Sequence, residues 1–174
     1  MKTKTMTPYQ VSVAAEAFAA CVLAHGGCEV GIQYGANQPG HDLVATRGHN
    51  ALKISVKGSQ DGGWGLIMSH KKPGVSYAEA ADLWCRVQPT NVIFCLVQFE
   101  GVQLGGAPRC YFASPEEIAK RLRESRGGRG STILYEDYTI KKGEAAGVTD
   151  KLPDSWKVSA KRIDELFQRH LPSA

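Results

Sequence analysis

Hydrophobic and polar positions follow two different periods along the chain, and each change of period predicts a new element. Apolar residues spaced three and four apart predict helices at 8–25, 76–88, 114–125 and 157–171. Alternating or continuous apolar positions predict strands at 28–35, 41–46, 51–58, 91–100 and 109–114. The order is helix, three strands, helix, two strands and two helices. It predicts a single α/β (α+β) domain over residues 1–174, with a central mixed β-sheet flanked by helices.

The starts of three predicted helices carry capping signals. Thr7 precedes a proline at the first helical position, Ser76 is followed three residues later by Glu79, and Ser114 precedes another proline. The first helix is expected to end at the glycine pair 26–27. A face of small residues on this helix is expected to lie against the sheet: Val13, Ala17, Ala20, Cys21 and Ala24.

Residues 59–74 and 131–150 follow neither period, although each can carry a short strand, the first around Leu66–Met68. The segment NVIFCLVQF, in contrast, is almost continuously apolar and is expected to form a central strand buried on both faces. No apolar run reaches the roughly 18 residues that a membrane span needs. We therefore expect no membrane partner and a cytoplasmic location.

Composition narrows the class of protein further. A hydrophobic fraction of 43% and a charged fraction of 22% are typical of a globular domain. The five cysteines are odd in number and show no CxxC spacing, which argues against a zinc site and a disulfide framework. They are expected to be buried thiols. A net charge of +4 permits an anionic partner without requiring one.

The candidate chemistry lies in HDLVATRGHNALKISVKGSQ, residues 41–60. A turn symmetric about positions 48–49 sets three cross-strand pairs: Thr46 with Ala51, Val44 with Lys53, and Asp42 with Ser55. In this register Asp42, Ser55 and the diagonal Lys57 converge on one face of the hairpin. A shift of the turn by one residue would separate them.

This pattern resembles the motif of the PD-(D/E)XK nuclease superfamily, in particular its Holliday-junction resolvase-like and restriction-endonuclease-like members. Glu16 in the first helix, Asp42 in GHDLVA and Lys57 in ISVKGS match the motif positions. The later apolar strand and YFASPEEIAKRL resemble the later strand and helix of that group. The resemblance implies a restriction-endonuclease-like fold. It also implies hydrolysis of phosphodiester bonds in DNA with Mg²⁺ or Mn²⁺.

The resemblance also implies a role for each residue. Asp42 would be the main metal ligand, Glu16 an outer ligand, and the backbone carbonyl of Val56 a further oxygen. Lys57 would orient the attacking water and offset charge in the transition state. These residue types suit the reaction, because a hard cation that prefers oxygen ligands can polarise the phosphate and generate hydroxide.

The chain departs from the motif at two positions. Ser55 stands where the motif has an acid, and its hydroxyl brings no negative charge to a cation. Pro39 lies three residues before Asp42 and is therefore displaced from its motif position. Direct participation of Ser55 stays open, and other polar residues can turn toward the site: Glu29, Gln60 and Asp61. Two alternatives follow: a catalytically inactive nuclease-fold protein that binds nucleic acid or a protein partner, and an unrelated α/β binding protein.

Basic residues gather at two further places. Arg126 and Arg129 lie in the glycine-rich segment RGGRG, which can follow a phosphate backbone, although a solvated helix end is the plainer interpretation. Lys71 and Lys72 form a smaller patch. Trp64, flanked by glycines, is expected in an exposed loop where it can contact a ligand. Because resolvase-like proteins are often dimers, the resemblance also allows a homodimer.

Overall fold

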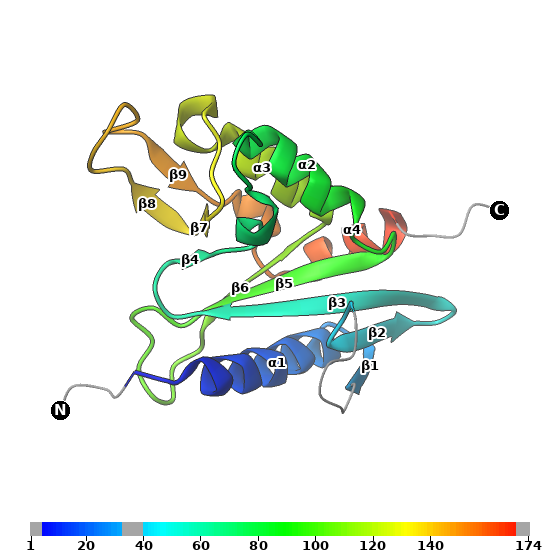
Figure 1. Ribbon diagram of the computed structural model, residues 1–174. Coiled ribbons are helices and arrows are strands. Elements are labelled where there is room, and N and C mark those ends of the chain that lie inside the picture. The colour runs from blue at the N-terminus through cyan, green and yellow to red at the C-terminus, as the bar shows by residue number, and fades with distance from the viewer. Residues whose placement is uncertain (1–4, 33–39, 170–174) are drawn as a thin grey trace.

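The computed structural model describes residues 5–32 and 40–169, so Pro39 and the end of the expected first strand lie outside it. Its elements, in chain order, are α1 (Pro8–His25), β1 (Glu29–Ile32), β2 (Leu43–Arg47), β3 (Asn50–Ser59), β4 (Gly63–Trp64), η1 (Met68–His70), α2 (Tyr77–Arg86), β5 (Val92–Gln98), β6 (Arg109–Ala113), α3 (Pro115–Gly128), β7 (Leu134–Tyr135), β8 (Asp137–Thr139), β9 (Thr149–Lys151), η2 (Asp154–Trp156) and α4 (Ala160–Arg169) (Figure 1).

The central sheet has five strands in the order β1-β2-β3-β5-β6. The first three strands form an antiparallel meander, β5 lies parallel to β3, and β6 is antiparallel to β5. Two small ribbons, β4-β7 and β8-β9, lie apart from this sheet. The expected mixed α/β architecture with a central mixed sheet is therefore confirmed.

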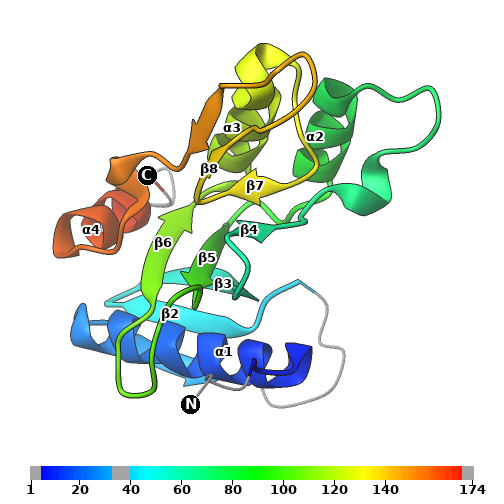
Figure 2. The ribbon, with the colours of Figure 1, turned by 90° about the vertical axis from the view of Figure 1, so that its left-hand side faces the viewer.

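Helices cover the two faces of the sheet (Figures 1 and 2). Apolar residues of α1 and α4 pack on one face, and those of α2 and α3 pack on the other. β5 supplies alternate side chains to both clusters, which explains why its sequence is continuously apolar. No helix in the described ranges is long and apolar enough to cross a membrane.

The predicted capping signals are formed in the structure. Thr7 makes a reciprocal capping box with Gln10, Ser76 makes one with Glu79, and Ser114 makes one with the residue three positions on. Each box satisfies backbone N–H groups that the first helical turn leaves without partners. α1 begins and ends at the residues that the sequence predicts.

The face of α1 that packs on the sheet was predicted wrongly. Val13 and the small residues around it are largely solvent-facing, whereas the buried positions are Val11, Ala15, Ala19 and Leu23. The helix is apolar almost all round, so its pattern does not select a face. Gly58 of β3 lets α1 pack closely on the sheet, because a Cβ there would lie 2.7 Å from Val11 Cγ1 and 2.9 Å from Ala15 Cβ.

Three other expectations were also wrong. Cys21 is exposed on the outer face of α1 and Cys85 is only half-buried, whereas Cys28 and two further cysteines are buried. Trp64 is 3% exposed, because β4 turns it into the core beside Leu134. The expected strand at 66–68 is replaced by the 3₁₀ turn η1.

Candidate functional site at the β2–β3 edge

The register of the β2–β3 hairpin is the predicted one over most of its length. Thr46 lies opposite Ala51 and Val44 lies opposite Lys53. The expected pair of Asp42 with Ser55 is not formed, because β2 begins only at Leu43. Asp42 lies in a bend, and its N–H donates to the carbonyl of Ile54 at 2.8 Å, while Leu43 also faces Ile54. Asp42 and Leu43 therefore both lie opposite Ile54, as in a β-bulge.

The bend turns the side chain of Asp42 toward β3. Its Oδ2 atom accepts a hydrogen bond from the N–H of Val56 at 2.6 Å, where β2 no longer supplies a backbone partner. The N–H and C=O of one strand residue point to the same side. The Val56 carbonyl therefore faces the same gap as the carboxylate. The structure thus brings together two of the three expected metal ligands.

Lys57 follows Val56 and is exposed. No ion pair joins it to an acid in the described ranges. It lies on a cavity of about 440 Å³ formed by the start of α1, the end of β3 and the segment through Leu66. The Lys57 carbonyl accepts a hydrogen bond from Trp64 Nε1 at 2.9 Å, so the buried tryptophan fixes the backbone of β3 at this cavity.

In the described ranges no hydrogen bond or ion pair joins the other predicted site residues to the Asp42 side chain. Ser55 is buried. Glu16 is half-buried in α1 and accepts a hydrogen bond from Ser12 at 3.1 Å. Ser12 lines the cavity, but among residues 5–32 and 40–169 no hydrogen bond or ion pair joins Glu16 to Asp42 or Lys57.

The three acids and amides considered as replacements are also engaged elsewhere. Glu29 lies opposite Thr46, at the far end of β2 from Asp42. The Gln60 side chain exchanges two hydrogen bonds with the backbone of Met6, and Asp61 accepts one from Ser59 at 2.8 Å. None of them is hydrogen-bonded to Asp42 in the described ranges, but Gln60 and Asp61 line the cavity that contains Lys57.

The donor set at this edge decides what cation it fits. The described residues contain no group of three or more His, Cys, Asp or Glu side chains arranged for a metal. What they offer is the Asp42 carboxylate and the Val56 carbonyl. Mg²⁺ in proteins is commonly held by one or two carboxylates, several waters and substrate phosphates. These residues therefore fit a cation shared with a phosphate and do not fit one held by the protein alone.

The two predicted basic patches differ from expectation in their local structure. Arg126 is not in a free loop: α3 continues to Gly128 through a kink, where Arg126 adopts a φ of 56° and its N–H donates to Asp150 at 3.0 Å. Arg129 pairs with Glu144 at 3.1 Å. The sequence contains no local signal for either acid, because both lie on a distant hairpin.

The tertiary structure places these patches side by side. The Lys71 ammonium lies 5.2 Å from the ring centroid of Tyr77. Gly130, next to Arg129, approaches the same tyrosine so closely that a Cβ would lie 2.5 Å from Tyr77 Cβ. Lys72 is exposed beside them. Tyr77 therefore lies between the segment of Lys71 and the segment of Arg129.

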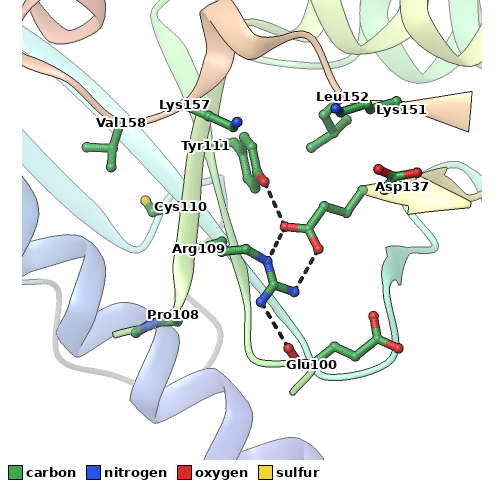
Figure 3. Close-up of a pocket in the computed structure, with 11 residues that line it drawn as sticks. Glu100, Pro108, Arg109, Cys110, Tyr111, Asp137, Lys151, Leu152, Lys157 and Val158 are labelled. Carbon is green, nitrogen blue, oxygen red and sulfur yellow. Dashed lines mark hydrogen bonds and ion pairs between the residues drawn. The ribbon is translucent and has the colours of Figure 1, made fainter. Parts of the chain in front are cut away.

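A second polar region lies at the β6 edge, on a cavity of about 640 Å³ (Figure 3). Arg109 donates from Nε and Nη2 to the two carboxylate oxygens of Glu136, at 2.7 and 2.8 Å. Tyr111 donates its hydroxyl to the same carboxylate at 2.7 Å. The third arm of the guanidinium reaches the Glu100 carbonyl at 3.0 Å. These partners are far apart in sequence, so no pattern predicts them.

The charges in this network reinforce one another. Burial disfavours ionisation of Glu136, but the hydrogen bonds from Arg109 and Tyr111 outweigh it, so the pKa of Glu136 lies below its usual value. Burial, together with the hydrogen bond to Glu136, raises the pKa of Tyr111 above its usual range. The three groups satisfy one another, which identifies this region as a structural link between β6 and the β7–β8 segment.

Comparisons of the chain with protein-family models, with curated proteins and with solved structures found no match.

Proposed function

We propose that this chain is a nuclease-fold protein that binds DNA at the β2–β3 edge and hydrolyses a phosphodiester bond with Mg²⁺ or Mn²⁺. The observation that carries the proposal is the Asp42 carboxylate held on the N–H of Val56, the residue before Lys57, which is exposed and forms no ion pair with a described acid. An anionic group fixed at an open strand edge beside a free cation suits a site for a metal ion and a phosphate.

The fold supports the proposal at a coarse level. A first helix, an antiparallel three-strand meander, a helix, a parallel strand, an antiparallel strand and a further helix follow one another. The resemblance to restriction-endonuclease-like proteins rests on this same order of elements. Asp42 lies in the bend before β2, and Lys57 lies in the part of β3 that extends beyond its pairing with β2.

Each side chain has a defined task under this proposal. Asp42 keeps one oxygen on Val56, and an ionised carboxylate has further acceptor sites for a cation. The Val56 carbonyl is the second protein donor. The ion would polarise the phosphate and lower the pKa of a bound water. Lys57 would hold that water and balance charge on the phosphate oxygens.

Ser55 favours a second candidate, a protein of the same fold that binds nucleic acid without cleaving it. The position contributes no carboxylate, and Glu16 is hydrogen-bonded to Ser12. A cation bound through one carboxylate is held less tightly than one bound through two or three. The two candidates share the binding surface and differ in turnover.

The test combines binding and cleavage on branched, single-stranded and duplex DNA, with EDTA, Mg²⁺ or Mn²⁺. Asp42→Asn keeps an oxygen for Val56 and removes the charge. Lys57→Ala removes the ammonium group, and Lys53→Ala is its matched control on the same strand. We expect cleavage to fall at least about 100-fold in the first two variants and to persist in the control.

Three results separate the candidates. Metal-dependent cleavage lost in Asp42→Asn supports the enzyme. Binding that Asp42→Asn and Lys57→Ala weaken, with no cleavage in either metal, supports the inactive protein. Wild-type protein that neither binds nor cleaves any of the three DNA forms rejects both.

A further inference from the structure

The β4–β7 ribbon presents two residues outward beside the Lys57 cavity. Trp64 and Leu134 lie opposite each other and are buried, so the neighbouring pair, Gly63 and Tyr135, faces the other way. A Cβ on Gly63 would lie 3.1 Å from Tyr135 Cδ1. The absence of a side chain at this position lets the tyrosine ring lie across the ribbon. Gly63 also lines the cavity that contains Lys57.

A second tyrosine extends this surface. Tyr138 of β8 stacks on Tyr135, with ring centroids 4.5 Å apart and ring planes inclined by 19°. Tyr138 is 37% exposed. Within residues 5–32 and 40–169, neither phenol makes a hydrogen bond, so stacking is the interaction that places these rings. Figure 1 shows β4, β7 and β8 gathered at the end of the molecule where β3 ends.

The charges around the two rings favour an anionic strand. Asp150 lies opposite Tyr138, but it is buried and accepts hydrogen bonds from Arg121 and from the N–H of Arg126. The turn that follows β8 carries Lys141 and Lys142, both exposed. Neither of these lysines forms an ion pair with a described acid. Asp150 is thus paired with Arg121. Asp137, the exposed neighbour of Tyr138 on β8, keeps its charge, and the two lysines of the turn outnumber it.

We propose that Tyr135 and Tyr138 form a platform on which an unpaired DNA base stacks, with the strand held by Lys57 on one side and by Lys141 and Lys142 on the other. This inference rests on the proposed function, because it names the form of DNA that the same site takes. An exposed aromatic ring with cations along its flanks is the usual construction of single-strand sites. A duplex keeps its bases stacked on one another and offers none to the rings.

The test uses a short single strand that carries 2-aminopurine, with the full chain and with Ca²⁺ as the divalent ion. Stacking quenches the fluorescence of this base, whereas phosphate contacts alone do not. Tyr138→Ala removes the outer ring, and Tyr138→Phe keeps it. Tyr9→Ala is the matched control, because Tyr9 is more exposed, at 78%, and no ring in the described ranges stacks on it. Thermal unfolding of each variant verifies the fold.

We expect quenching on wild type and on Tyr138→Phe. Tyr138→Ala should lose the quenching and bind the strand about 5- to 150-fold more weakly, while Tyr9→Ala should resemble wild type. A duplex should show no dependence on Tyr138. If Tyr138→Ala binds and quenches as Tyr9→Ala does, the platform is rejected and DNA binding at the β2–β3 edge stands. If wild type binds neither strand nor duplex, both the platform and the proposed function are rejected.

Discussion

Two carboxylates in this molecule occupy contrasting settings. Among the described residues, Glu136 accepts three hydrogen bonds, two from Arg109 and one from Tyr111, whereas Asp42 accepts one from the Val56 backbone. Glu136 is buried within a network, and Asp42 lies half-buried in the bend just before β2. A carboxylate saturated by its own fold has little capacity for a ligand. A carboxylate with unused acceptor sites retains that capacity.

The difference therefore separates a structural polar cluster from a candidate functional one. The larger of the two cavities lies beside the saturated cluster and the smaller one beside Lys57, so cavity size does not distinguish a saturated carboxylate from one with unused acceptor sites. Four substitution experiments test this division, in order of expected effect.

Removing Glu136 has the largest expected effect on stability. Glu136→Ala leaves the Arg109 guanidinium and the Tyr111 hydroxyl without their acceptor, which should cost about 2–4 kcal/mol in free energy of unfolding. Urea denaturation measures this change. Glu124→Ala is the control, because its pair with Lys120 is exposed and spans 3.9 Å. Equal losses in the two variants would contradict a structural role for the network.

The helix α1 packs closely on β3 at Gly58. Gly58→Ala places a methyl group 2.7 Å from Val11 Cγ1 and should cost about 1–3 kcal/mol. Gly31→Ala is the matched control, since its new Cβ would meet only the Val44 carbonyl, at 3.9 Å. Thermal unfolding compares the two. A Gly58 variant as stable as the Gly31 variant would show that α1 can move away from β3 at little cost.

The pH dependence of stability sharpens the contrast further. The pKa of Glu136 is lowered in the folded protein, so its contribution is present above the unfolded value of about 4.5 and is lost as pH falls through the folded pKa. Glu136→Gln does not titrate. The stability difference between wild type and this variant should be greatest near neutral pH and narrow below about pH 4.5. A constant difference across this range would contradict the ionised network.

Asp42 should matter least for stability and most for function. Asp42→Ala loses one hydrogen bond at a partly solvated position, which should cost about 1 kcal/mol, and Asp42→Asn should cost less. Chemical denaturation measures both, beside the DNA assays. A loss as large as that of Glu136→Ala would place Asp42 among the structural residues instead.

Local signals account for what could be predicted. The capping residues Thr7, Ser76 and Ser114 act within one helical turn, so a short stretch of sequence is enough to locate three helix starts. The hairpin register follows likewise from its turn and from alternation on each strand, and it holds down to Val44 and Lys53.

The pairing of β2 with β3 does not continue to Ser55, because the Asp42 side chain bonds to the backbone of β3 instead. Its carboxylate accepts a hydrogen bond from the N–H of Val56, in the part of β3 that β2 does not pair, and the backbone bends at Asp42. That outcome depends on where β2 starts relative to β3, which residue types alone do not determine.

By itself, the sequence determined the four helices and the strands of the central sheet, their order, the mixed sheet and the pairing of the hairpin, because these depend on neighbours within a few residues. Only the tertiary structure decided which face of α1 is buried, which acids hold Arg126 and Arg129, and which carboxylate stays available. Gly58 sets the buried face of α1, Asp150 holds Arg126, and Glu144 holds Arg129. They act across distances along the chain that leave no periodic trace, since contact energy depends on proximity in space and not on separation in sequence.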